Sequence, residues 1–77
     1  MAERLPSLRP REVIRALERA GFQVRRQTGS HVILHKPGHP CPVPVPRHAK
    51  TMRRELLAQI IKEAGLSREE FLDLLGQ

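Results

Sequence analysis

Hydrophobic and polar residues follow two different periods along this chain, and the change of period marks its structural elements. Apolar residues recur every three or four positions over 10–20, over 52–64 and again after Ser67, which predicts three helices. Between the first two helices, apolar and polar residues alternate over 22–27 and 30–36, which predicts two half-buried strands. We expect the strand residues that face the core to be Phe22, Val24, Val32 and Leu34.

The helix boundaries carry residues that suit them. Pro10 fits the first position of a helix, where its missing N–H would have no partner. Gly21 can adopt the left-handed conformation that ends a helix. Ser67 and Glu70 have the spacing of a capping box, which predicts that the last helix begins just after Ser67.

Residues 41–46 have proline at every second position. Alternate N–H groups of a strand point to the same side, so Pro42, Pro44 and Pro46 would remove the donors of one edge while the other edge can still pair. This spacing predicts an edge strand; the alternative is an irregular polyproline-like segment. In the strand, the side chains expected to face the core are Cys41, Val43 and Val45.

These elements predict an α+β fold in the order α-β-β-β-α-α. A three-stranded antiparallel sheet needs its apolar face covered, and the two longer helices have apolar stripes that can cover it. The result is a two-layer sandwich with its helices on one face of the sheet. The other face stays open and carries His31 and His35. The length of 77 residues predicts a single domain, 1–77.

Charge is unevenly distributed along the chain. Up to residue 54 there are twelve Lys or Arg against three acidic residues, and after it two against five. A basic body of this kind predicts contact with a polyanion such as nucleic acid. The single Cys41 excludes an internal disulfide. Because no apolar run has the length of a membrane span or the pattern of a signal peptide, we expect a cytoplasmic protein.

Gly29-Ser30-His31 is the candidate site, because it places an imidazole on a tight turn in the basic part of the chain. Histidine titrates near neutral pH and can transfer protons there. A zinc site is the alternative for these side chains, with His31, His35, His39 and Cys41 as ligands. Their spacing matches no usual structural zinc pattern, and His35 and Cys41 would face opposite sides of the sheet. We therefore expect no metal and no other cofactor.

Several short motifs together resemble one family. They are Glu12-Val-Ile-Arg-Ala-Leu17, Ala20-Gly21-Phe22, Gly29-Ser30-His31, Val45-Pro46 with His48, and residues 57–66 with Ile60-Ile61 and Ala64-Gly65-Leu66. In this order and spacing they resemble the HicA (YcfA-like) toxins of toxin–antitoxin systems, from about Leu8 to Leu75. The chain departs from the family at Val32, where many members have a second histidine or an aromatic residue, and in the proline density of 42–46.

The resemblance implies a fold like that of double-stranded-RNA-binding domains. It implies an mRNA interferase that cleaves RNA without a metal, with His31 as its catalytic histidine, and a HicB-type antitoxin as partner. Gly29 and Ser30 would shape the phosphate site, partly through backbone N–H groups. The candidates for binding the RNA backbone are Arg25, Arg26, Arg47 and Lys50.

Two further histidines have open roles. His48 could supply a complementary acid, or it could contact RNA or order its loop. His35 could contact RNA or simply be exposed. The alternative to an enzyme is a module that binds double-stranded RNA by shape and phosphate contacts, without cleavage. A histidine in place of Lys or Arg at the turn favours the enzyme.

Overall fold

The computed structural model describes residues 7–48 and 51–76, and its elements follow the predicted order. They are α1 (Pro10–Arg19), β1 (Gln23–Gln27), β2 (His31–His35), β3 (Val43–Pro46), α2 (Arg54–Glu63) and α3 (Arg68–Leu75). The α+β class is confirmed.

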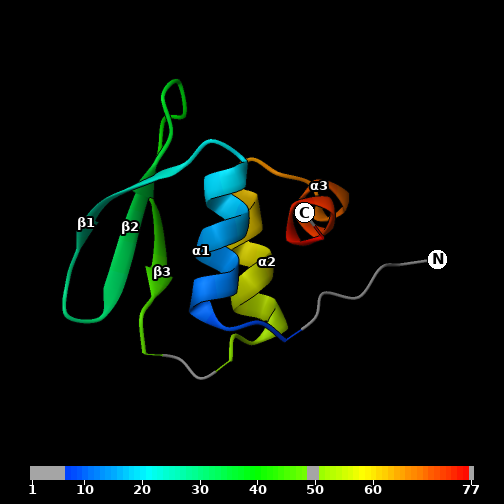
Figure 1. The fold of residues 1–77 in the computed structure, drawn as a ribbon, viewed down its shortest axis with the longest axis horizontal. Coiled ribbons are helices and arrows are strands. Elements are labelled where there is room, and N and C mark those ends of the chain that lie inside the picture. Colours follow the sequence, from blue (N-terminus) through cyan, green and yellow to red (C-terminus); the bar gives the residue numbers. More distant parts are fainter. Residues whose placement is uncertain (1–6, 49–50, 77) are drawn as a thin grey trace.

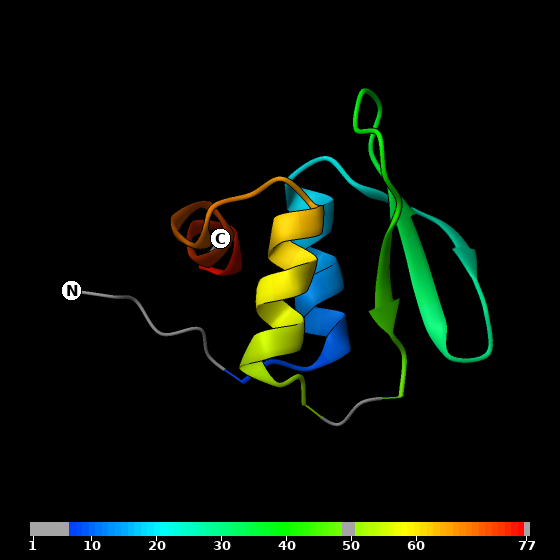
Figure 2. The same cartoon turned by 180° about the vertical axis from the view of Figure 1, so that it is seen from behind.

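The strands form one antiparallel sheet with β2 in the middle. The helices all lie on one side of this sheet, as the two opposite views in Figures 1 and 2 show. Helices α1 and α2 contact the sheet, whereas α3 packs against α1 and α2. Arg19 Nη1 donates a hydrogen bond to the Leu74 carbonyl at 2.6 Å, which fastens α3 to the end of α1. Among the described residues, no helix covers the opposite face of the sheet.

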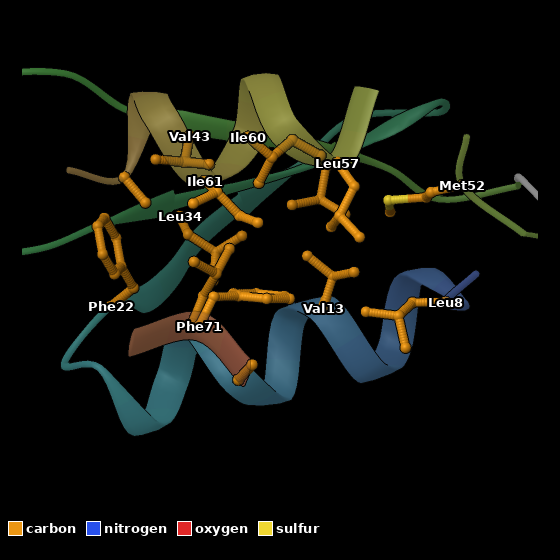
Figure 3. Packing of buried hydrophobic residues seen from close by; sticks show 14 of the residues in the cluster. Leu8, Val13, Phe22, Leu34, Val43, Met52, Leu57, Ile60, Ile61 and Phe71 are labelled. Atoms are coloured by element: carbon orange, nitrogen blue, oxygen red, sulfur yellow. The ribbon is translucent and has the colours of Figure 1, made fainter. Parts of the chain in front are cut away.

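The core fills the space between the sheet and the helices (Figure 3). Val32 and Leu34 of β2 are buried as predicted, while His31 and Ile33, which alternate with them, are half-buried and His35 is exposed. The buried apolar side chains that meet them from the helices are Val13, Ala16, Leu17, Leu57, Ile60, Ile61 and Phe71. Burial of one such large side chain contributes about 1.5–3 kcal/mol, so this shared core holds the sheet and the helices together.

The proline-rich segment is an edge strand, as its spacing predicted. Val43 pairs with Leu34 and Val45 with Val32, and both valines are fully buried. The ladder continues beyond the strand, where the Arg47 N–H donates to the Ser30 carbonyl at 2.8 Å. The expectation that Cys41 faces the core was wrong: Cys41 is exposed, because pairing begins at Val43 and Cys41 still belongs to the preceding loop.

The opposite edge strand, β1, also differs from its prediction. Phe22 is buried as expected, but it precedes the strand, and Val24 is 37 % exposed. Val24 pairs with Leu34 and so lies on the helix-facing side of the sheet. It is nevertheless exposed because β1 is the strand farthest from the helices, as Figure 1 shows. The register shifts between Val24 and Arg26, so that Arg25 lies in a β-bulge.

One helix boundary is shifted and two are confirmed. Helix α2 begins at Arg54 and not at residue 52, because Arg53 is an N-cap with extended backbone (φ −68°, ψ 153°) and Met52 forms a short bridge to Leu8, whose carbonyl accepts from the Met52 N–H at 2.8 Å. Helix α1 ends at Arg19 with Ala20 as its C-cap, and Gly21 follows in the left-handed conformation with a φ of 104°, as predicted. The capping box of α3 is present: Ser67 Oγ accepts from the Glu70 N–H at 3.0 Å, and Glu70 accepts from the Ser67 N–H at 2.8 Å. No described helix is long and apolar enough to cross a membrane.

Candidate functional site

The turn between β1 and β2 is organised by the hydroxyl of its first residue. Thr28 Oγ1 accepts hydrogen bonds from the backbone N–H groups of His31, at 2.9 Å, and Ser30, at 3.3 Å. It also lies 3.2 Å from the His31 carbonyl, to which it donates. Of the Gly29 and Ser30 N–H groups that we expected to contribute to a phosphate site, that of Ser30 is thus already bonded to Thr28. The turn is held by its own contacts.

Gly29 is not required by the backbone of this turn. Its φ is not positive, and a Cβ added to it would meet no atom within 4 Å. A larger residue would therefore fit the folded chain. What a glycine does provide is an open surface next to His31, where another molecule can approach the backbone closely.

The His31 imidazole is oriented by its neighbour. Its Nδ1 lies 3.0 Å from Ser30 Oγ, and the side chain is half-buried. A hydroxyl can either donate or accept, so Ser30 can serve either tautomer of the ring. Within residues 7–48 and 51–76, no hydrogen bond engages His31 Nε2. The arrangement suits a group that exchanges a proton at Nε2 with a bound molecule.

The residues that follow β3 hold the turn from the other side. Arg47 Nη1 donates to the Thr28 carbonyl at 2.9 Å, and His48 Nε2 lies 2.7 Å from the Gly29 carbonyl. With the bond from the Arg47 N–H to Ser30, three consecutive carbonyls of the turn each bond to residue 47 or 48. We call Arg47 and His48 the clamp.

The other predicted site residues lie elsewhere on the sheet. Arg26 pairs with Ile33 and so shares the open face with His31. Arg25 and His35 line a shallow depression of about 320 Å³ together with Lys36. His35 lies four residue steps along β2 from His31, or about 13 Å, so this depression is a separate place. Lys50 lies outside the described residues.

The electrostatic setting favours anions. Residues 19–54, which include the whole sheet and its turns, contain no Asp or Glu. In contrast, the basic residues in that span are Arg19, Arg25, Arg26, Lys36, Arg47, Lys50, Arg53 and Arg54. A surface of one sign attracts polyanions and speeds their association.

Potential metal ligands do not gather in the described part of the chain. No three His, Cys, Asp or Glu side chains there lie close enough to hold one ion. His39 is engaged elsewhere: its Nε2 donates to the Glu63 carbonyl at 2.6 Å, and its ring packs on Phe22 with centroids 5.3 Å apart. The donor set considered from the sequence is thus not assembled.

Sequence reasoning missed Thr28 as a site residue. Thr and Ser hydroxyls often bond to backbone N–H groups two and three residues further on, and so stabilise turns. A threonine directly before Gly29-Ser30 is the signal that could have identified it.

Comparison with known families decides what kind of protein carries this turn. Residues 10–66 of the 77 match the family described as HicA toxin of bacterial toxin-antitoxin. The chain belongs to the HicA toxin family. The match confirms the resemblance and includes the turn, the sheet and the clamp. No curated protein matches the chain. As a HicA toxin, the protein is one half of a toxin–antitoxin system, so an antitoxin is an implied partner.

Proposed function

We propose that this HicA toxin is a metal-independent endoribonuclease that cleaves mRNA, with His31 as its general acid or base. The observation that carries the proposal is the His31 ring itself. Ser30 orients it through Nδ1, and it stands beside the open surface at Gly29, on a sheet whose own strands and turns contain no Asp or Glu.

RNA supplies its own nucleophile, which explains how one histidine can suffice. In cleavage, the 2′-hydroxyl loses its proton and attacks the adjacent phosphorus, and the 5′-oxygen leaves with a proton. A histidine at Nε2 can take the first proton or give the second, with water taking or giving the other. Arg26 on the same face, together with Arg25, is placed to bind flanking phosphates by charge. The Gly29 surface would let a phosphate approach the turn.

Single-turnover cleavage of a model RNA tests the proposal, with protein in excess. His31→Ala should lose at least 100-fold in rate, within the range that general acid–base catalysis contributes. His35→Ala is the matched control, because His35 lies on the same strand and the same face. The rate of RNA cleavage by His35→Ala at saturating protein should stay near that of the wild type. A substrate with 2′-deoxyribose at the cleaved position should resist the wild type, and a chelator should leave the rate unchanged. Equal rates for His31→Ala and the wild type would refute the proposal.

The alternative is a non-catalytic module that binds double-stranded RNA. Its support is the basic sheet and the element order, which the resemblance associates with such domains. It predicts tight RNA binding without cleavage. It also predicts that, if expression of the protein arrests cell growth, His31→Ala does not change that arrest. The oriented imidazole favours the enzyme, because binding by charge alone needs no proton-transfer group.

We further propose that the implied antitoxin is of the HicB type and covers His31 with an acidic surface. Complementary charge would speed its association with the basic face. In the purified complex, His31 should be protected from diethylpyrocarbonate. Modification of His31 at the rate of the free toxin would exclude direct occlusion.

A further inference from the structure

We propose that His48 is a positioning residue, which holds the Gly29-Ser30-His31 turn in place through a hydrogen bond and transfers no proton. This inference rests on the proposed ribonuclease function. It decides between the two roles that the sequence left open for His48, a complementary acid or a group that orders its loop.

The hydrogen bond to Gly29 places a proton on Nε2 of the His48 ring. A carbonyl oxygen only accepts, so His48 Nε2 must carry a proton and donate it at 2.7 Å. If His48 released this proton to a leaving group, the bond that holds Gly29 would break. In the neutral ring with this tautomer, Nδ1 has no proton to give, so an acid role for His48 would require Nδ1 of the charged ring. The observed contact commits Nε2 to the turn, which is the role of a fixed donor.

The sheet places His48 where such a donor is needed. Pro46 pairs with His31, and the same antiparallel register brings Arg47 opposite Ser30 and His48 opposite Gly29. Arg47 bonds to the carbonyls on either side, those of Thr28 and Ser30. The clamp therefore holds three consecutive carbonyls of the turn. Thr28 holds the N–H groups of Ser30 and His31.

Loss of the bond from His48 to the Gly29 carbonyl would affect His31 through Ser30, the residue that lies between Gly29 and His31. His31 Nδ1 bonds to Ser30 Oγ, so a shift of the Gly29–Ser30 peptide moves the partner that orients the ring. Displacement of a reacting group by about 1 Å can cost about 100-fold in rate. The clamp thus gives the proposed active site a precise geometry although the turn is exposed.

Two substitutions of His48 separate positioning from proton transfer. In His48→Gln the side-chain amide can donate to Gly29 from nearly the same place, but it cannot exchange protons near neutral pH. His48→Ala removes the donor. We expect His48→Ala to cleave model RNA at least tenfold more slowly, and His48→Gln to recover most of that loss with the pH profile of the wild type. If His48→Gln is folded yet as slow as His48→Ala, or lacks one limb of the pH profile, His48 transfers protons and the proposal is wrong. Wild-type cleavage by His48→Ala would equally overturn it.

Hydrogen exchange gives a readout that does not depend on cleavage. The backbone N–H groups of Ser30 and His31 should exchange several-fold faster in His48→Ala than in the wild type, and His48→Gln should restore their protection. If the wild type cleaves no RNA, the proposed function fails while this measurement still tests the clamp. Identical exchange of these two N–H groups in the wild type and in His48→Ala would overturn the positioning role.

Discussion

Replacement of Thr28 by valine is the sharpest test of how the turn is built. Valine has nearly the shape of threonine and lacks its hydroxyl. In the structure this hydroxyl accepts from the N–H groups of Ser30 and His31 and donates to the His31 carbonyl. Thr28→Val therefore removes three hydrogen bonds and leaves the covalent turn otherwise unchanged.

The loss of stability can be worked out from these contacts. Each hydrogen bond contributes a net of about 0.5–1.5 kcal/mol, and a donor left inside the protein costs more. Thr28 and Ser30 are exposed, so water can replace part of the lost bonds. We expect the free energy of unfolding to fall by about 1–2 kcal/mol in total. For a domain of this size that lowers Tm by about 5–15 °C.

The effect on cleavage should exceed the effect on folding. Below its Tm the variant is still folded, but the His31 N–H is no longer held and the ring loses its fixed position. We expect cleavage of model RNA to slow by about tenfold or more, which corresponds to about 1.4 kcal/mol in the barrier.

The assay combines thermal unfolding, followed by circular dichroism, with single-turnover cleavage at 25 °C. Thr28→Ser is the matched control, because serine keeps the hydroxyl and loses only a methyl group. It should retain most of the stability and most of the rate. Wild-type Tm and rate in Thr28→Val would refute the reasoning, and so would a Thr28→Ser protein that is as impaired as Thr28→Val.

Three further changes test other parts of the structure. Gly29→Ala should leave Tm unchanged or slightly higher, because the added Cβ meets no atom within 4 Å. The same variant should bind RNA more weakly in a titration at constant salt, and unchanged binding would show that no ligand approaches the backbone at Gly29. Leu34→Ala should lower the free energy of unfolding in urea by about 2–5 kcal/mol, since Leu34 is fully buried, and a loss below 1 kcal/mol would contradict this packing. The pKa of Glu70 is lowered from 4.5, mainly by the hydrogen bond from the Ser67 backbone N–H and secondly by the contact with the Ser67 hydroxyl. The cap therefore stabilises α3 fully above about pH 4.5, and this stabilisation is lost as the pH falls through the lowered pKa. Glu70→Gln should reduce this acid-side loss in urea titrations, and an unchanged pH dependence would refute the assignment.

The fold was largely predictable because each element has a simple period. The alternation that buries Val32 and Leu34 is confirmed, and so is the edge strand at 43–46. The exposure of Val24 was not predictable from its own segment, because alternation says which side of a sheet a residue faces and not how far the helices extend over it. Val24 faces the helix side, but it lies on the strand farthest from the helices.

The missed boundaries have a different cause. Met52 continues the apolar stripe of α2 in sequence, and it is buried as that stripe predicts. Met52 is nevertheless held in an antiparallel bridge with Leu8 and Arg53 after it is extended, so the helix begins only at Arg54. Cys41 likewise fits the alternation of β3, but it precedes the first paired residue. In both cases a partner distant in sequence decides where the element begins, and a local period cannot contain that information.

The site shows the same division between local and distant information. Gly29-Ser30-His31 can be recognised in the sequence, and the bond from Thr28 is a local motif that could have been found. The clamp depends instead on the register between β2 and β3. The prolines restrict that register: with Pro44 and Pro46 lacking N–H groups, only the N–H groups of Val43, Val45 and Arg47 can face β2. A one-residue slip would turn Val43 and Val45 away from the core and would move His48 from Gly29 to a neighbouring residue. The same proline spacing that makes β3 an edge strand therefore also helps to place the His48 donor at the turn that carries His31.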